Sequence, residues 1–125
     1  MNERRKYPRL ERTLLITLKG DAFHLSTETK NISGSGAYCQ VSRPIPELSK
    51  PAVTLLIPVT AREEVGLQEI ECEGVVVRSE RILRDNGTPE KYFIAIYFTR
   101  MGRTDRSKLR QYVSHQLMEK SDDGA

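Results

Sequence analysis

Short runs of alternating apolar and polar residues, separated by turn residues, constrain the fold of this chain most strongly. Such an alternation has the period of a β-strand, so each run predicts a strand with one buried face. Glycine, proline, asparagine and aspartate lie between the runs, where a chain turns. The predicted strands cover residues 13–19, 23–30, 37–41, 53–58, 69–78 and 92–98. Strands this short and frequent favour a closed or nearly closed antiparallel β-barrel of about six strands.

The connections between the runs refine this prediction. Pro44 and Pro46 end the third strand because proline cannot donate to a strand ladder. Residues 60–68 are rich in charged side chains and are expected to form a loop. Gly74, in the middle of a long strand, indicates a bulge that lets a sheet curl on itself. The segment Asp85–Gly87 predicts a tight hairpin.

The period changes near the C-terminus. Apolar residues recur every four positions from Leu109 to Leu117, which predicts a helix from about Asp105 to Glu119 with Thr104 as its N-cap. We expect this helix to cover one end of the barrel, and a partner-binding helix is the alternative. The expected organisation is a flexible basic arm over 1–12, a barrel with its closing helix over 13–119, and a disordered tail over 120–125.

Basic residues are concentrated ahead of the first predicted strand. Residues 1–12 hold five basic and two acidic side chains, so the net charge of +3 lies entirely on this arm. Tyr7 and Pro8 favour an extended backbone, because proline fixes its own φ and restricts the residue before it. A short, ordered basic arm suits an anionic partner, whereas a solvated tail is the alternative.

Several classes of protein are not expected. No apolar run approaches the roughly 20 residues that span a bilayer, and the N-terminus lacks the apolar centre of a secretory signal, so we expect a cytoplasmic protein without membrane insertion. Cys39 and Cys72 lie on separate strands and are expected to be reduced core thiols, with no metal site. His24 should lie on a solvated strand face. Neither His24 nor His115 lies near a cysteine or a glycine-rich elbow, so no catalytic residues are expected.

Small polar residues from Lys30 to Gly36 form a candidate binding bend between two strands. Gly34 and Gly36 allow backbone angles that other residues avoid, and they let other groups approach the backbone. Asn31 and Ser33 offer hydrogen-bonding groups but no strong base or nucleophile. Such a bend suits holding a ligand better than cutting one, although alone it is equally a simple turn.

Two motifs together carry a family resemblance. Arg5 and Arg9 are spaced as Arg-x-x-x-Arg, and Asn31, Ser33 and Gly36 follow as Asn-x-Ser-x-x-Gly. With this strand layout and the terminal helix, the chain resembles the PilZ domain family, bacterial receptors for cyclic di-GMP, from Arg4 to about Leu117. The resemblance implies a split-barrel-like β-barrel without a cofactor. It also implies that cyclic di-GMP is bound by Arg4, Arg5, Arg9, Asn31, Ser33 and Gly36.

The chemistry of cyclic di-GMP fits these residue types. An arginine fork can meet the O6/N7 edge of guanine or a phosphate with two parallel hydrogen bonds, and its flat face can stack on a base. We expect Arg5 and Arg9 to contribute most, with Arg4 next. Asn31 stands where the family often has an acidic residue, and its amide oxygen accepts hydrogen bonds without a charge. The length of the chain favours a stand-alone adaptor, monomeric or weakly dimeric, that signals to a downstream protein controlling motility, biofilm or exopolysaccharide.

Other functions remain as alternatives. An RNA-binding barrel fits the basic charge, but the aromatic residues lie within strand and helix patterns without an evident exposed stacking surface, and the body of the chain is neutral. A nucleic-acid polymer is therefore not expected as a partner. A PilZ domain that binds only proteins is the other alternative, against which the intact arginines and bend argue. We assign Arg78 to the surface, outside the binding site.

Overall fold

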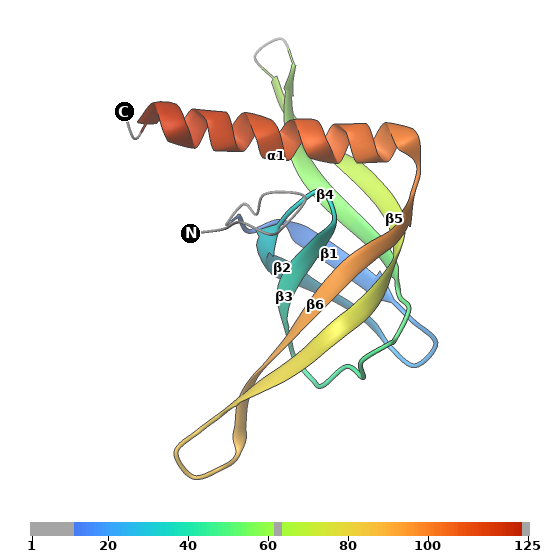
Figure 1. Ribbon diagram of the computed structural model, residues 1–125, viewed down its shortest axis with the longest axis vertical. Helices are drawn as coiled ribbons and strands as arrows, with labels where there is room; N and C mark the ends of the chain where they lie inside the picture. Colours follow the sequence, from blue (N-terminus) through green and yellow to red (C-terminus); the bar gives the residue numbers. More distant parts are fainter. Residues whose placement is uncertain (1–11, 62–63, 124–125) are drawn as a thin grey trace, which may run out of the picture.

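Six antiparallel strands form a closed barrel in the computed structural model, which describes residues 12–61 and 64–123 (Figure 1). The order around the barrel is β1-β2-β3-β6-β5-β4, and β1 closes the ring by pairing with both β2 and β4. This confirms the predicted fold class. The elements are β1 (Leu15–Lys19), β2 (His24–Ile32), β3 (Gly36–Val41), β4 (Ala52–Ala61), β5 (Glu64–Leu83), β6 (Pro89–Met101) and α1 (Arg103–Asp123).

The core follows the alternation that predicted the strands. In β1, Ile16 and Leu18 are buried, whereas Leu15, which directly precedes Ile16, is 52% exposed. Alternate residues of β3 are buried in the same way. Leu109 and Val113 of α1 belong to the same core, so the apolar stripe of the helix packs on the barrel as predicted. His24 and the other outward residues of β2 up to Lys30 are exposed, which confirms the predicted solvated face of this strand.

Helix α1 lies across one end of the barrel (Figure 1). It begins two residues earlier than predicted, because the carbonyl of Gly102 accepts the backbone N–H of Arg106 at 2.9 Å. Thr104 therefore lies inside the first turn, and its predicted role as N-cap is wrong. The helix continues through residues 120–123, where the sequence predicts a disordered tail. Within the described part of the chain, no helix has the length and apolar character needed to cross a membrane.

Two hairpins extend from the barrel at its opposite ends (Figure 1). The β5–β6 hairpin turns at the predicted Asp85–Gly87 segment, where Gly87 has a φ of 85°. The predicted loop over 60–68 is wrong, because residues 60–61 belong to β4 and residues 64–68 to β5. The ladder of the β4–β5 hairpin includes Pro58 opposite Leu67. Both of these residues are solvent-exposed, so this part of the hairpin has no buried face to produce a strand-like alternation.

Gly74 marks an irregularity in β5, as predicted. The pairing register with β6 shifts between Glu73 and Gly74. A Cβ at Gly74 would lie 2.8 Å from the side chain of Ile96 and 3.2 Å from that of Val53. The position therefore combines a change of register with close packing across the barrel.

Both cysteines are free thiols, and the fold favours their protonated form. Burial raises the pKa of Cys39 and of Cys72 from 9.0 to about 12, and burial also raises the pKa of Tyr38 and Tyr112. We therefore expect the free energy of unfolding to fall as the pH rises from 9 towards 12. Urea denaturation at about pH 8 and about pH 10.5 measures this fall. It should be smaller in the double variant Cys39→Ala/Cys72→Ala, and an equal fall would contradict the assignment to the thiols.

Candidate functional site

A row of four residues crosses the outer face of four neighbouring strands. Asn31 of β2 lies opposite Tyr38 of β3, which lies opposite Ala95 of β6, which in turn lies opposite Arg78 of β5. Residues that face each other in adjacent strands point to the same side of a sheet. The row therefore places an amide, an aromatic ring and a guanidinium group on one patch of the barrel wall.

A bulge in β2 turns Asn31 outward. Thr29 pairs with the buried Cys39 and is itself 1% exposed, so it faces the core. Asn31, two residues further on, pairs with Tyr38 because the register shifts between these positions. Since β2 continues through Ile32, Asn31 lies on a strand, and its predicted place on the bend is wrong.

A second bulge, in β5, turns Arg78 outward. Val76 is fully buried opposite Ile96, and the register shift after it brings Arg78 opposite Ala95 on the other face. Arg78 lies on the surface, as predicted, and it lines the same cavity as Asn31, which makes it a further candidate residue of the site. Strict alternation after Val76 would have placed Arg78 inside the barrel, and only the bulge reveals its position.

The three predicted residues of the bend motif line one cavity of about 200 Å³. Gly36 and Ala95, the residues with the least bulk at this place, are among those that line it. The residues that line the cavity are Asn31, Ser33, Ser35, Gly36, Ala37, Tyr38, Val77, Arg78, Ala95, Ile96 and Tyr97. The structure thus brings Asn31, Ser33 and Gly36 together, whereas the predicted Arg4, Arg5 and Arg9 lie outside the described residues.

Ser33 shapes the turn beside this cavity. It is 6% exposed, and its backbone N–H donates to the carbonyl of Gly36 at 2.9 Å. Its hydroxyl oxygen accepts the backbone N–H of Ser35 at 3.2 Å and lies 3.2 Å from the hydroxyl of Ser35. These bonds fold the turn that connects β2 to β3 and hold two hydroxyl groups at the cavity.

Position 36 requires glycine because β6 passes close to it, and not because of its backbone angle. A Cβ at this position would overlap the carbonyl oxygen of Ile96 in β6. Within residues 12–61 and 64–123, Gly87 is the glycine with a positive φ. The predicted use of unusual angles at Gly34 and Gly36 is therefore wrong, while the predicted close approach is confirmed at Gly36.

Tyr38 and Arg78 are held by a shared carboxylate. The hydroxyl of Tyr38 donates to Oε1 of Glu80 at 2.7 Å, and Nε of Arg78 lies 3.7 Å from the same oxygen. The guanidinium carbon of Arg78 lies 5.9 Å from the centre of the Tyr38 ring. Burial and the Glu80 carboxylate raise the pKa of Tyr38, so its hydroxyl stays protonated and able to donate.

Aromatic rings also lie on this outer face, contrary to the prediction. Tyr38 stacks on Phe93 with 5.4 Å between ring centres, and Tyr97, which lines the cavity, is 52% exposed. All three rings point outward because their strand neighbours face the core. A surface of this kind can receive a flat heterocycle, since a base has a π-face whatever its identity.

Arg106 connects the turn to helix α1. Its Nη1 donates to the carbonyl of Gly34 at 3.3 Å. The neighbouring Asp105 carboxylate accepts the backbone N–H of Glu71 at 3.1 Å, so the first turn of α1 is attached to both β5 and the β2–β3 turn.

We expect Arg106→Gln to lower the free energy of unfolding by about 1 kcal/mol, because a partly exposed charged hydrogen bond to the turn is lost. Urea denaturation measures this change. Arg103→Gln, an exposed position in the same turn of α1, is the control. Equal stability of the two variants would show that Arg106 does not hold the turn.

The start of the described chain is attached next to the site. The hydroxyl of Thr29 donates to the carbonyl of Arg12 at 2.6 Å and accepts the backbone N–H of Leu14 at 3.0 Å. Thr29 precedes Asn31 by two residues in β2. The described chain therefore begins beside the strand that carries Asn31.

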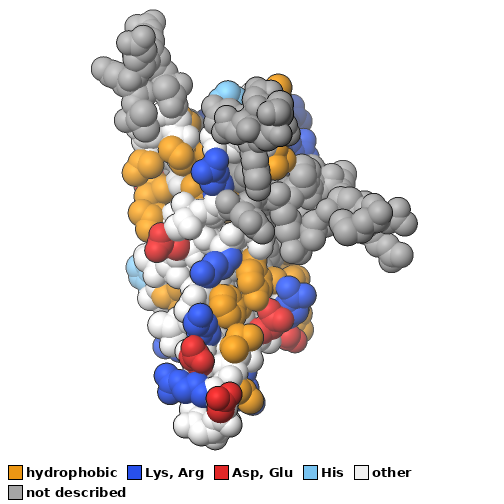
Figure 2. All heavy atoms as spheres, turned by 90° about the vertical axis from the view of Figure 1, so that its left-hand side faces the viewer, with side chains coloured by type: hydrophobic (Ala, Val, Ile, Leu, Met, Phe, Trp, Pro, Cys, Tyr) orange, Lys and Arg blue, Asp and Glu red, His pale blue; other side chains and the backbone are white. Residues whose placement is uncertain are grey.

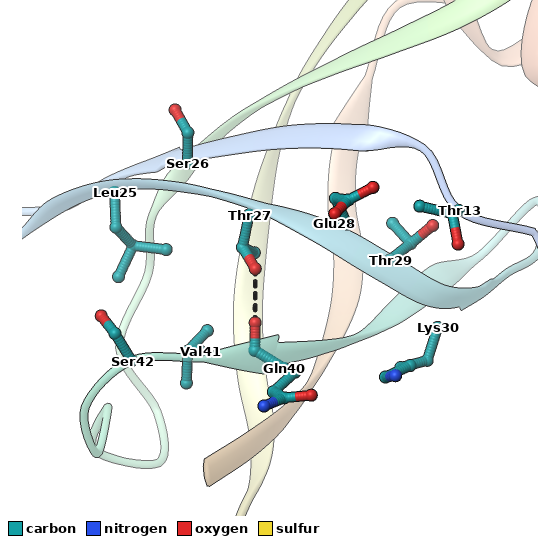
Figure 3. Close-up of a pocket in the computed structure, with 10 residues that line it drawn as sticks. All are labelled: Thr13, Leu25, Ser26, Thr27, Glu28, Thr29, Lys30, Gln40, Val41 and Ser42. Atoms are coloured by element: carbon teal, nitrogen blue, oxygen red, sulfur yellow. Dashed lines mark hydrogen bonds between the residues drawn. The ribbon is translucent and has the colours of Figure 1, made fainter. Parts of the chain in front are cut away.

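A larger cavity of about 360 Å³ lies further along the same two strands (Figure 3). Strands β2 and β3 pair from Thr29 to Ile32 of β2. Towards the N-terminal end of β2 the two strands separate. Figure 3 shows Leu25 and Thr27 pointing into the gap, where the Thr27 hydroxyl donates to the carbonyl of Gln40. We assign the candidate site to the smaller cavity, because Asn31, Ser33 and Gly36 line it and no described residue of the predicted motifs lines the larger one.

The smaller cavity offers binding groups and little material for catalysis. Its amide, hydroxyl and guanidinium groups can form hydrogen bonds, and the described residues that line it include no imidazole, carboxylate or thiol. Among the described residues, no group of three or more His, Cys, Asp and Glu side chains is placed to hold a metal ion. The arrangement suits recognition of a polar, flat and anionic molecule.

Comparison with known protein families gives one match. The model of the PilZ domain matches residues 3–115, which is most of the chain. A search of curated proteins found no match. The matched range includes both the arginine motif and the Asn-x-Ser-x-x-Gly motif.

Several solved structures share the fold. The inhibitor of motility MotI/DgrA from Bacillus subtilis aligns with a TM-score of 0.77 and 21% identity, over 95% of this chain and 54% of that one. The PilZ domain of YcgR from Escherichia coli with c-di-GMP aligns with a TM-score of 0.59 and 15% identity, over 96% and 98%. The MrkH–c-di-GMP complex from K. pneumonia aligns with a TM-score of 0.73 and 16% identity, over 98% and 57%. The chain thus spans about half the length of MotI/DgrA and MrkH.

Proposed function

The chain belongs to the PilZ domain family, and from this premise we propose that it is a receptor for cyclic di-GMP that signals to a downstream protein. The observation that carries the proposal is the cavity on the outer barrel wall. It gathers Asn31, Ser33 and Gly36, which match the family's Asn-x-Ser-x-x-Gly pattern, around one recess. Two similar structures, the YcgR PilZ domain and MrkH, contain this ligand by their descriptions.

The basic arm is long enough to reach this cavity. Arg12 is attached beside β2 through Thr29. Arg9 lies three residues before Arg12, so their Cα atoms are within about 11 Å, and Arg5 lies within about 25 Å by the same measure. We propose that Arg5 and Arg9, with Arg4 in support, fold over the cavity and meet the phosphates and guanine edges of the ligand.

Ligand binding would also change the arm. Five basic side chains on twelve residues repel one another, and the two phosphodiester charges of cyclic di-GMP offset this repulsion. We propose that the bound arm presents a new face to the downstream partner, in the manner of a ligand-ordered switch. The proposed role is that of an adaptor that leaves its ligand intact.

Arg78 is a further contributor in this proposal. Its guanidinium group lines the cavity and lies over the Tyr38 ring. We expect Arg78→Ala to weaken binding of cyclic di-GMP by about tenfold, because one charge-assisted contact is lost. Calorimetric titration measures the change. Arg81→Ala, at an exposed position further along β5, should leave the affinity unchanged, and a loss equal to that of Arg78→Ala would point to net charge alone.

The proposal as a whole is tested by titrating the chain with cyclic di-GMP, cyclic di-AMP and a short single-stranded RNA. Cyclic di-GMP should bind saturably and be recovered intact, and cyclic di-AMP should bind far more weakly because adenine lacks the O6 acceptor. Salt-dependent binding of the RNA with no response to cyclic di-GMP would support the RNA-binding alternative instead. Recovery of a linear dinucleotide would show that the chain hydrolyses cyclic di-GMP and is therefore an enzyme.

A further inference from the structure

Exposed apolar side chains gather around one groove that the proposed ligand site does not use. The groove runs between α1 and the β4–β5 hairpin and consists of two adjoining recesses of about 690 and 360 Å³, which share Pro58, Tyr112 and Gln116. Of the nine exposed large hydrophobic residues in the described chain, four border or lie beside it: Leu15, Val59, Leu67 and Met118. We call this surface the α1 groove.

The fold explains why the groove remains open. Leu109 and Val113 pack α1 onto the core, but further along the helix Met118 is 67% exposed. The β4–β5 hairpin rises beside the helix and leaves Leu67 66% exposed. Figure 2 shows hydrophobic side chains gathered at the upper left of the molecular surface in that view. Monomeric proteins rarely expose large contiguous apolar surfaces unless a partner covers them.

The charges around the groove indicate which kind of partner. The basic side chains among its lining residues are Arg12, Lys108 and His115. Nζ of Lys108 lies 3.9 Å from Oδ1 of Asp105, which lies outside the groove. No Asp or Glu is among the lining residues that the structure describes. An apolar floor with a basic rim is complementary to an amphipathic segment whose polar face is acidic. We propose that the α1 groove docks an acidic amphipathic helix of the downstream partner.

Other occupants fit the groove less well. In a symmetric pair of identical chains the same patch meets itself, so two basic rims would be brought together and would repel one another. An anionic membrane also combines apolar and acidic character, but the apolar side chains here line recesses, whereas a lipid surface requires them to project. The concave shape therefore favours a helix in a groove.

Arg12 links this surface to the start of the chain. It lines the smaller recess, and its charge lowers the pKa of Tyr112 on α1 against the larger effect of burial, which raises it. Arg12 is also the residue through which the basic arm joins the barrel. The docking proposal extends the proposed adaptor role, but its test needs no cyclic di-GMP, so the two proposals can fail separately.

The test uses a labelled peptide of about 18 residues with leucine on one helical face and glutamate on the other, and a second peptide with lysine in place of each glutamate. Fluorescence anisotropy should show saturable binding of the acidic peptide and at least about tenfold weaker binding of the basic one. The double variant Leu67→Ala/Met118→Ala should weaken binding of the acidic peptide by about tenfold. The matched control Ile82→Ala/Leu83→Ala, on the distant β5–β6 hairpin, should bind as the wild type does.

Several results would overturn the proposal. They are equal binding of the two peptides, equal affinity of the two double variants, or no binding to the wild-type chain. Sedimentation with vesicles of phosphatidylglycerol that is lost in Leu67→Ala/Met118→Ala would assign the groove to a membrane surface. Self-association of the wild type that the same variant abolishes in analytical ultracentrifugation would assign it to a second copy of this chain.

Discussion

Alanine at both Arg5 and Arg9 is expected to weaken binding of cyclic di-GMP by at least about 100-fold, because two bidentate, charge-assisted contacts are lost together. The melting temperature should not change, since both residues precede the barrel and its core. Calorimetric titration of the double variant Arg5→Ala/Arg9→Ala against the wild type measures the loss. Unchanged affinity would remove the arm from the binding site.

The charge-preserving variant Arg5→Lys/Arg9→Lys separates geometry from charge. Lysine keeps the positive charge but offers no planar fork and does not stack as a guanidinium group does. We expect the lysine variant to bind clearly more weakly than the wild type and more tightly than the alanine variant. Wild-type affinity in the lysine variant would show that the arm acts through charge alone.

Gly36→Ala is expected to lower the free energy of unfolding by about 2–3 kcal/mol. The added Cβ would overlap the carbonyl oxygen of Ile96, so β3 and β6 must separate at the site. Binding of cyclic di-GMP should fall as well, because the same glycine lines the cavity. Denaturation in urea and calorimetric titration measure the two effects.

Gly66→Ala provides the matched control for this strand substitution. A Cβ at Gly66 meets nothing within 4 Å, so the variant should be as stable as the wild type or slightly more stable. If Gly36→Ala were as stable as Gly66→Ala, the close approach of β3 and β6 would not explain the glycine.

Side-chain periodicity predicted the barrel well because most strands bury one face. The buried Leu14, Ile16 and Leu18 alternate with solvated positions, and α1 buries Leu109 and Val113 at helical spacing. The segment 60–68 was predicted wrongly because its sequence lacks this alternation of buried and solvated positions. The β4–β5 hairpin extends beyond the barrel there, so hydrogen bonding between the strands and not burial determines its structure.

The candidate site was only partly predictable from the sequence, because bulges decide which residues reach it. Asn31 follows the inward-facing Thr29 by two positions, and Arg78 follows the inward-facing Val76 by two. Alternation alone would place both inside the barrel. Each lies outside because one extra residue shifts the register, and the identity of Lys30 or Val77 does not reveal such a shift.

The motifs predicted Asn31, Ser33 and Gly36 through the family resemblance, whereas Tyr38 and Tyr97 carry no motif signal. Tyr38 reaches the cavity through its pairing with Asn31, and its ring is held by Phe93 and Glu80 from strands distant in the sequence. Such neighbours depend on strand order around the barrel, which local patterns do not specify. Arg4, Arg5 and Arg9 stay predictions, since they lie outside the described residues.

Following the amide signals of the isotope-labelled chain during a titration with cyclic di-GMP tests the central claim most directly. We predict saturable shifts at residues 4–7 and 9, which flank Pro8, and at Asn31, Ser33, Gly36 and Arg78, with Gly20 and Gly87 at distant turns unaffected. Saturable shifts that leave residues 4–7 and 9 unaffected, shifts confined to the cavity of Figure 3, or no shifts at saturating ligand would contradict a site formed by the arm and the β2–β3 turn.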